Sequence, residues 1–376
     1  MRSFRPVFKN KSIKTKPDYF LIGAVVGLLF FGIIMVYSAS CYNAEINYGN
    51  KYYYATKQVF GVILGIITLF ICSKIDYHIL KKYNLIILVV SIVLLILVFI
   101  PGIGVENYGA KRWIKFPFFT LQSSELAKMG YIIFCASYMA KYHEKMIKFK
   151  FLLPILGVGG IICLLIMLEP NMSVTMCVAM LMMCMAFIGG ANIKHFALIL
   201  FPLACLVPVL IIMEPYRLAR LTAFLNPWES PLDEGYQLIQ SLYALGSGGW
   251  FGVGLFNSRQ KYLFLPFSES DFIFSVIGEE LGLLGCGLIL FVFAFIVYRA
   301  IKIAQNASDR FGCYMATGIA CIIAIQVLMN VAVVTGSIPP TGLPLPFISA
   351  GSTSLIAFCA GIGILTNIRK NSRIYY

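Results

Sequence analysis

Four carboxylates stand in or beside one of the most hydrophobic stretches of the sequence. They are Glu269, Asp271, Glu279 and Glu280, within LPFSESDFIFSVIGEELG at residues 265–282. A carboxylate at a membrane surface can act as a general base that takes a proton from a substrate hydroxyl. On one continuous helix Glu279 would lie about 12 Å deeper than Asp271 and about 80° around the axis, and Glu280 about 180° around it. We therefore expect a single base, Asp271, at the outer rim, with Glu279 and Glu280 bonded to neighbouring helices.

Two arginines at the end of an earlier hydrophobic stretch form a second candidate feature. Arg217 and Arg220 are three residues apart, so on a helix both side chains leave the same face. Two guanidinium groups in this arrangement can bind a pyrophosphate through paired hydrogen bonds. The alternative is that both side chains extend to the lipid headgroups.

The segment LQSSELAKMGY combines a helix start with an unusual charge. Ser123 or Ser124 can cap the helix, and Glu125 complements the helix dipole in the first turn. Capping does not explain Lys128, which lies one turn deeper and can pair with Glu125. An ionisable residue inside a membrane span indicates a function by default.

These residues stand in a chain whose composition is typical of a membrane protein. It has 376 residues, of which 60% are hydrophobic and 12% charged, and its mean hydropathy is +0.85. A soluble domain of this length could not bury so much apolar surface. The eleven cysteines have no paired spacing, which favours small core residues over disulfides or metal ligands.

Ten apolar stretches near 20 residues long predict ten transmembrane helices. They are residues 19–40, 59–75, 84–101, 124–142, 151–168, 172–189, 195–213, 270–299, 311–334 and 346–367. With both termini in the cytoplasm, the cytoplasmic segments hold 20 Lys and Arg residues and the outer loops hold 9, which follows the positive-inside rule. The net charge of +14 is thus a topology signal and does not indicate nucleic-acid binding. The predicted fold class is an all-α integral membrane protein, a single polytopic domain over residues 1–376 with cytoplasmic tails at 1–18 and 368–376.

The predicted outer face is acidic and lacks histidine. In this topology 12 of the 16 carboxylates lie outside or at outer helix ends, whereas His78, His143 and His195 are all cytoplasmic. Acid–base chemistry on the outer face must therefore use carboxylates, and a histidine-rich zinc site is excluded there.

Two outer connections are long, residues 102–123 and 214–269. The second is too long to be structureless, so we expect a large structured outer loop between the seventh and eighth spans. Residues 236–245 predict a short amphipathic helix on the membrane surface, and the glycine-rich run 246–254 predicts a turn or a close backbone approach. Glu169-Pro170-Asn171 predicts a tight outer turn between the fifth and sixth spans, and its residues serve either an ordinary Pro-Asn turn or the site.

Several long motifs follow one another in order along nearly the whole chain. They are NYGAKRWI…LQSSELAK, EPNMS, RLARLTAFLNPWESP…GYQLIQSLYALGSGGWFGVGLFNSRQKYLFLP…SDFIFSVIGEELG and TGLPLPFISAGSTS. In these motifs the chain resembles the SEDS family of bacterial shape, elongation, division and sporulation proteins. The EPNMS and FLNPW…GYQ stretches are more similar to the FtsW and SpoVE members than to RodA. The resemblance implies a bundle of ten membrane helices, in agreement with the count above.

The resemblance also implies an activity and its setting. Members of the family are peptidoglycan glycosyltransferases, which join lipid II (undecaprenyl-pyrophosphate disaccharide pentapeptide) into glycan strands on the outer face of the bacterial cytoplasmic membrane. They work with a class B penicillin-binding protein as transpeptidase. An FtsW-type member would act at the division septum with other membrane proteins of the division machinery.

The resemblance assigns roles to residues of this sequence. The proposed catalytic aspartate of the family corresponds to Asp271. The Glu and Lys of its Q-P-S-E-x-x-K motif correspond to Glu125 and Lys128, and its paired arginines to Arg217 and Arg220. With Gln122 and Ser124, these residues are expected to bind substrate. The residues expected to support the site are Glu269, Ser270, Glu279, Glu280, Glu169 and Asn171.

Three positions depart from the family pattern. Glu269 stands where a histidine is frequent, and Ser123 replaces the proline of Q-P-S-E. The usual S-Y-G-G reads Ser349-Ala350-Gly351-Ser352, which leaves this last motif with a structural role. None of the departures removes the candidate base.

The residues and the resemblance together give a mechanistic hypothesis. Asp271 takes the proton from the 4-hydroxyl of the acceptor GlcNAc, and that oxygen displaces the polyprenyl pyrophosphate from the donor sugar with inversion. Arg217 and Arg220, with Lys128 or a divalent cation such as Mg²⁺ or Mn²⁺, would stabilise the departing pyrophosphate.

Two other classes of function compete with an enzyme. A lipid II flippase or an ion-coupled carrier could use Lys128, Glu279 and Glu280 inside the membrane. A carrier, however, needs a midplane site and paired broken spans, whereas the polar residues here gather at one face. A scaffold that only recruits a cell-wall synthase would leave the intramembrane charges and the arginine pair unexplained.

Overall fold

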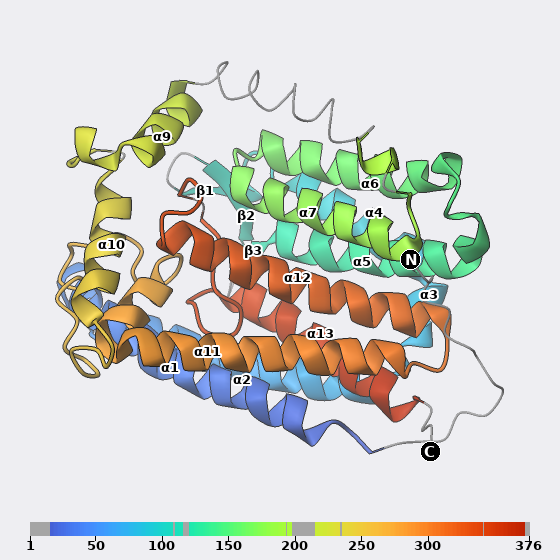
Figure 1. The fold of residues 1–376 in the computed structure, drawn as a ribbon, viewed down its shortest axis with the longest axis horizontal. Coiled ribbons are helices and arrows are strands. Elements are labelled where there is room, and N and C mark those ends of the chain that lie inside the picture. The colour runs from blue at the N-terminus through green and yellow to red at the C-terminus, as the bar shows by residue number, and fades with distance from the viewer. Residues whose placement is uncertain are drawn as a thin grey trace.

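The protein is a bundle of long helices that lie side by side, with one helix, α10, crossing an end of the bundle (Figure 1). The computed structural model describes residues 16–107, 110–115, 120–192, 194–197, 215–233, 235–340 and 342–372. Its long helices are α1 (Tyr19–Tyr48), α2 (Tyr53–Lys74), α4 (Asn84–Leu97), α5 (Ser123–Tyr142), α6 (Phe149–Leu168), α7 (Met172–Gly189), α11 (Ile273–Gln305), α12 (Arg310–Val334) and α13 (Ser352–Lys370). The shorter elements are α3 (His78–Lys82), η1 (His143–Lys145), α9 (Pro215–Leu225), η2 (Pro227–Glu229), α10 (Tyr236–Gly248) and the strands β1 (Gly104–Asn107), β2 (Ala110–Lys115) and β3 (Thr120–Gln122).

Nine of the ten predicted spans coincide with helices, and the seventh, 195–213, lies almost entirely outside the described residues. Within the described part of the chain, seven helices are long and apolar enough to cross a membrane: α1, α2, α6, α7, α11, α12 and α13. The apolar helix α4 has 14 residues, about 21 Å, which is shorter than a hydrocarbon core of about 30 Å. Helix α5 is less apolar because it contains Glu125 and Lys128. The chain is therefore a mostly helical, multi-pass membrane protein.

The two terminal helices meet the same end of the bundle. Arg299, near the end of α11, pairs with Asp18 at the start of α1 at 2.6 Å. The connection from α11 to α12 reaches Tyr77, whose hydroxyl donates to Asp309. The backbone amide of Tyr77 in turn donates to Asn367 at the end of α13. The start of α1 and the end of α13 thus lie at the same end of the bundle.

The opposite end of the bundle carries the connections that the sequence predicts to be on the outer side. The first contains an antiparallel sheet in the order β1-β2-β3, which the sequence analysis did not predict. The last strand runs directly into α5, so the sheet fixes where that helix begins. The second contains α9, η2 and α10. The predicted helix at 236–245 is present and extends to Gly248, and it packs against α11 and α12.

The eighth span differs from its prediction in two respects. The helix begins at Ile273, so Asp271 precedes it, and its backbone is not helical at Gly282, where φ is 67° and ψ is −167°. Two helical parts, 273–281 and 283–305, therefore replace one continuous helix. Since apolar residues stand on both sides of Gly282, hydrophobicity alone gave no sign of the break.

The last span also begins later than predicted. Residues 343–350 are an irregular loop, and α13 starts only at Ser352. Leu343, Leu345, Phe347 and Ile348 are at most 1% exposed. The segment is apolar because it is buried among helices, and prolines at 344 and 346 oppose a helix there. Irregular backbone at membrane depth is tolerated where protein surrounds it.

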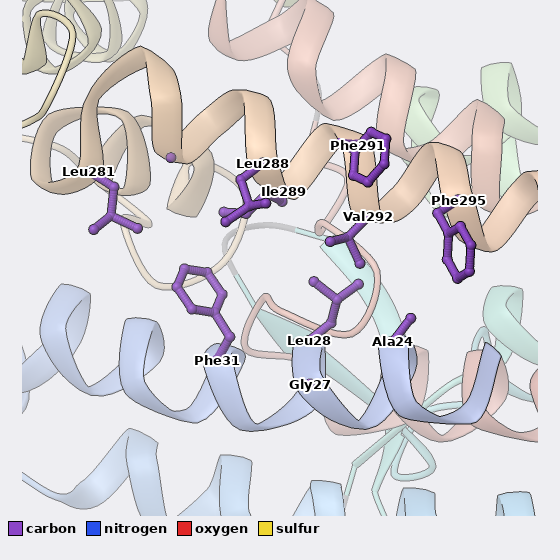
Figure 2. Close-up of a pocket in the computed structure, with 11 residues that line it drawn as sticks. Ala24, Gly27, Leu28, Phe31, Leu281, Leu288, Ile289, Phe291, Val292 and Phe295 are labelled. Carbon is purple, nitrogen blue, oxygen red and sulfur yellow. The ribbon is translucent and has the colours of Figure 1, made fainter. Parts of the chain in front are cut away.

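An apolar groove of about 500 Å³ lies between α1 and α11. Figure 2 shows Leu28 and Phe31 of α1 on one side, with Leu288 and Val292 of α11 facing them. The side chains that line it are all apolar, so the groove cannot supply acid–base chemistry. The polar residues predicted to do chemistry lie elsewhere in the bundle.

Candidate functional site

Asp271 lies just before α11, held by its backbone and close to a glycine of the buried loop. Its carbonyl oxygen accepts a hydrogen bond from Asn330 Nδ2 at 2.8 Å. Its carboxylate Oδ2 would be 2.9 Å from a Cβ atom at Gly342. The side chain is half-buried and does not cap α11, whose N-cap residue is Phe272 without a side-chain bond. Asp271 thus occupies a fixed position between α12 and the loop that follows it.

The loop 342–350 supports the residues next to Asp271. Ser349 Oγ donates to the carbonyl of Ser270 at 2.6 Å and accepts from the amide of Leu345 at 2.7 Å. The amide of Ala350 donates to the carbonyl of Glu269 at 2.9 Å. Three consecutive carbonyl groups, those of residues 269, 270 and 271, are therefore held by hydrogen bonds. The motif TGLPLPFISAGSTS thus holds the backbone of the segment that carries the candidate base.

Glu125 and Lys128 form a buried ion pair. Lys128 Nζ lies 2.7 Å from Glu125 Oε1, and the side chains are 1% and 2% exposed. The pairing agrees with the sequence prediction. A lysine so deeply buried is retained only with close partners, because an unpaired charge at this depth is costly.

A chain of hydrogen bonds links Lys128 to Asp271 through α12. Lys128 Nζ donates to Gln326 Oε1 at 2.8 Å, and Gln326 Nε2 donates to the carbonyl of Pro344 at 2.9 Å. One turn along α12, Asn330 Nδ2 donates both to Leu343 O and to Asp271 O, each at 2.8 Å. Gln326 of α12 thus bonds to Lys128 of α5, and together with Asn330 it ties the buried loop to the ion pair and to Asp271.

The start of α5 differs from the predicted capping arrangement. The helix begins at Ser123 with Gln122 as N-cap residue, and no side chain caps it. The prediction of a Ser123 or Ser124 cap was wrong, because strand β3 leads straight into the helix. Ser123 Oγ instead donates to Glu169 Oε1 at 3.4 Å, and the amide of Gln122 donates to Thr353 Oγ1 at 3.3 Å.

The turn at 169–171 is present between α6 and α7 and contacts the same end of the bundle. Asn171 caps α7 by accepting from the amide of Val174 at 3.3 Å. Two residues later, Ser173 Oγ accepts from the amide of Gly342 at 2.9 Å, which connects α7 to the buried loop. Glu169 is 1% exposed.

Some buried oxygens near the ion pair and Asp271 have no hydrogen-bond partner within the described part of the chain. They include Ser124 Oγ, Glu169 Oε2 and Asn330 Oδ1. Buried polar atoms are nearly always paired, and exceptions concentrate where a protein binds something or reacts. Ser124 is next to Glu125 of the ion pair, Glu169 is part of the turn at 169–171, and Asn330 binds the carbonyl group of Asp271. The arrangement can therefore hold a polar group and take up a proton.

Glu169 gives a pH dependence of stability. Burial raises the pKa of its carboxyl from 4.5 to about 8, against the smaller opposing effects of the Ser123 hydrogen bond and the Arg112 charge. The folded state therefore binds this proton more tightly than the unfolded chain, so the stabilisation is complete below pH 4.5 and is lost as pH rises through about 8. We expect the thermal unfolding midpoint in detergent to fall as pH rises from 4.5 to about 8. Glu169→Gln should remove that part of the fall, and an equal fall in both proteins would contradict the assignment.

Three further candidate residues are Glu269 and the two arginines, Arg217 and Arg220. Glu269 is 7% exposed, and burial raises the pKa of its carboxyl, opposed by hydrogen bonds from its own backbone and from Ser268. Arg217 and Arg220 both belong to α9, on one helical face, but their side chains fall outside the described part of the structure. The pyrophosphate role of the arginines therefore stays a prediction.

Glu279 and Glu280 are fully buried but bind partners other than those expected. Only Ser38 of α1 comes from a helix, and it donates to Glu280 at 2.6 Å. The other partners belong to the outer loop at residues 258–261. The prediction of helix-to-helix bonding was thus wrong for most of these contacts, because the loop folds back against α11.

A metal site is not formed by the described residues: no three His, Cys, Asp or Glu side chains among them gather closely enough to hold an ion. His78 lies at the opposite end of the bundle, with Nδ1 2.7 Å from Asp76 Oδ1. The cation suggested for the pyrophosphate has no ligand set among these residues.

The sequence matches a protein family model and several known proteins over nearly its whole length. The model of the cell cycle protein family of FtsW, RodA and SpoVE matches residues 19–374. Stage V sporulation protein E of Bacillus subtilis is 40% identical over 362 residues, which cover 96% of this chain and 99% of that protein. A probable peptidoglycan glycosyltransferase FtsW of Trichlorobacter lovleyi is also 40% identical, over 95% of this chain and 94% of its own.

Solved structures share the architecture. A chain from a peptidoglycan synthase complex, described for its structural coordination of polymerization and crosslinking, has a TM-score of 0.79 and 25% identity, with 95% of this chain and 98% of that chain covered. The rod shape determining protein RodA of Thermus thermophilus has a TM-score of 0.68 at 22% identity, over 95% and 98% of the two chains, and supports the fold alone.

Proposed function

Because the chain belongs to the FtsW, RodA and SpoVE family of cell cycle proteins, we propose that it is a peptidoglycan glycosyltransferase of the FtsW type. Its substrate is lipid II, which it polymerises into glycan strands on the outer face of the cytoplasmic membrane. One observation carries the proposal: the half-buried Asp271 lies at the same end of the bundle as the buried Lys128, and hydrogen bonds from α12 to the buried loop hold both Lys128 and the backbone of Asp271.

Asp271 is the general base in this proposal. Its carboxylate accepts the proton of the 4-hydroxyl group of the acceptor GlcNAc as that oxygen attacks C1 of the donor sugar. The bond between C1 and the pyrophosphate oxygen breaks, and undecaprenyl pyrophosphate leaves with the bonding electrons. Attack opposite the leaving group inverts the configuration at C1.

The negative charge of the leaving pyrophosphate must be stabilised by cationic side chains. Lys128 lies at the site end of the bundle, and the helical face of α9 that carries Arg217 and Arg220 lies in the outer connection. Cationic groups held in place before the reaction stabilise charge that develops in the transition state. Two guanidinium groups on one helical face are suited to binding the pyrophosphate. The buried charge of Lys128 is suited to holding the site together.

The cellular setting follows from the same premise. The multi-pass bundle supports a location in the bacterial cytoplasmic membrane, where the proposed topology has ten spans and both termini in the cytoplasm. The names of the FtsW relatives support the division septum. The similarity to a chain of a peptidoglycan synthase complex supports a partner that supplies the crosslinking step. That partner is a class B penicillin-binding protein, which works with other membrane proteins of the division machinery.

The proposal is tested by reconstituting the purified protein in vesicles with labelled lipid II, with and without the transpeptidase partner. We expect glycan strands on gel electrophoresis. Translocation of lipid II between leaflets without strand formation would instead favour a flippase. Absence of both, with a partner activated by the protein, would favour a scaffold.

A further inference from the structure

The break in α11 at Gly282 is built around a segment of the outer loop. In a continuous helix the amides of Leu283 and Leu284 would donate to the carbonyls four residues earlier. Here they donate to Gly249 O at 2.9 Å and to Trp250 O at 3.1 Å. The freed amides are thus satisfied by residues more than thirty positions earlier in the chain.

The freed carbonyls are satisfied in the same way. Glu279 O accepts from the amide of Val253 at 2.9 Å, and Glu280 O accepts from the amide of Gly254 at 3.0 Å. Residues 249–254, which we name the splint, therefore replace both lost helical hydrogen bonds. The approach is so close that a Cβ at position 252 would lie 2.1 Å from Glu280 O. The glycine-rich run predicted to allow a close backbone approach does so here.

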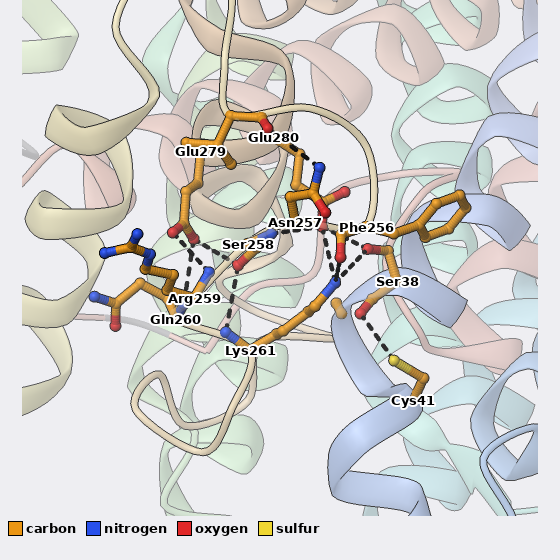
Figure 3. Close-up of polar contacts among 12 residues, drawn as sticks. Ser38, Cys41, Phe256, Asn257, Ser258, Arg259, Gln260, Lys261, Glu279 and Glu280 are labelled. Carbon is orange, nitrogen blue, oxygen red and sulfur yellow. Dashed lines mark hydrogen bonds and ion pairs between the residues drawn. The ribbon is translucent and has the colours of Figure 1, made fainter.

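Buried side chains hold the continuation of the splint against α1 and α11. Lys261 Nζ lies 3.3 Å from Glu280 Oε1, and the two side chains are 3% and 0% exposed. Ser38 of α1 donates to the same Glu280 oxygen at 2.6 Å. Figure 3 shows Lys261 extended from the loop toward Glu280 and Ser38. A charge pair in such surroundings is stable only as a pair.

Glu279 fixes the loop on the other side. Its carboxylate accepts from the amide of Arg259 at 2.8 Å, from the amide of Gln260 at 3.3 Å and from Ser258 Oγ (Figure 3). One carboxylate thus satisfies two consecutive backbone amides of the turn. Neither glutamate has a bond to Asp271 among these contacts, so their role in the reaction is indirect.

The first part of α11 connects this anchored break to the candidate base. Residues 273–281 form a helical arm about 13 Å long, and Asp271 lies two residues before its first residue. The arm is held near its Asp271 end by Ser275, whose hydroxyl lies 2.8 Å from that of Ser241 in α10. The direction of the arm is set where it leaves the rest of α11, at Gly282. A tilt at that point moves Asp271.

We propose that Lys261 and Glu280 are positioning residues for the glycosyl transfer. They hold the splint in the break of α11 and thereby aim the arm that carries Asp271. The inference rests on the proposed function. According to this inference, glycan polymerisation requires the splint to be bound in the break of α11. Substrate binding by residues outside the arm does not require it.

The test compares initial rates of lipid II polymerisation by full-length variants with those of the wild-type protein. We expect Lys261→Met to lower kcat about tenfold to a hundredfold with KM within about twofold, because small displacements of a reacting group have effects of that size. The double variant Lys261→Met/Glu280→Gln removes the unpaired charge and should recover part of kcat. Gly252→Ala, which displaces the splint without changing any charge, should match Lys261→Met. Lys51→Met, at an exposed lysine of the outer side, is the matched control and should keep the wild-type rate.

The outcomes separate this inference from the proposed function. A wild-type protein that forms no glycan strands contradicts the function itself. A wild-type rate in folded Lys261→Met and Gly252→Ala, or a change confined to KM, overturns the positioning role. Monodispersity and thermal unfolding in detergent establish folding for each variant. If all three variants fail to fold, the network serves stability alone and the inference is likewise overturned.

Discussion

Asp271→Asn is expected to lower lipid II polymerisation by about a hundredfold to ten-thousandfold while leaving the fold intact. The substitution keeps the size of the side chain but removes its ability to take a proton. The backbone contacts of residue 271 are unaffected, since Asn330 bonds to its carbonyl group. The measurement is the initial rate of glycan strand formation by purified protein, with unfolding temperature as a check on structure.

The control for this substitution is Asp233→Asn. Asp233 is an exposed aspartate between η2 and α10 in the outer loop. The Asp233→Asn variant should polymerise lipid II at the wild-type rate. Wild-type polymerisation by Asp271→Asn would remove the general base from the proposal. It would then leave the site with a role in substrate binding alone.

Lys128→Met is expected to reduce both stability and activity. The variant leaves Glu125 buried without its partner 2.7 Å away, and breaking a buried pair in this way costs about 3–5 kcal/mol. It also removes the bond to Gln326 and so loosens the loop that supports Asp271. If Lys128 also stabilises the leaving pyrophosphate, the rate should fall about a hundredfold or more. Denaturant unfolding and polymerisation rates measure the two effects separately.

A double variant distinguishes the two roles of Lys128. Glu125→Gln/Lys128→Met removes both charges, so most of the lost stability should return. The rate should stay low, because the positive charge is still missing. Recovery of both properties would show that the pair is purely structural. Lys57→Met, at an exposed lysine that donates to Tyr53, serves as control for the loss of a cation.

The sequence was sufficient for features that depend on local geometry. Hydrophobic length located nine helices, and i,i+3 spacing gave the pairing of Glu125 with Lys128. The glycine-rich run indicated a close approach because only glycine permits it. In each case the residues that interact are neighbours, or the property belongs to one segment.

Features that depend on distant partners were missed or wrong. The buried loop at residues 342–350, whose carbonyl groups accept hydrogen bonds from Gln326 and Asn330 of α12, was not expected. That loop was read as the start of a membrane span, because burial within protein and burial in lipid select the same apolar residues. The break at Gly282 could not be predicted from the sequence around it, because the hydrogen bonds that replace the helical ones come from residues 249–254.

The hydrogen bonds that fix residues 269–271 have a consequence for biosynthesis. Their donors are Asn330, Ser349 and Ala350, which leave the ribosome about 60 to 80 residues after the segment that they hold. Domains and helices are delivered to the membrane from the N-terminus onward. A nascent chain that already contains Asp271 therefore lacks the groups that orient it. The proposed catalytic end is completed only when the final helix is inserted, so incomplete chains in the membrane carry no formed site.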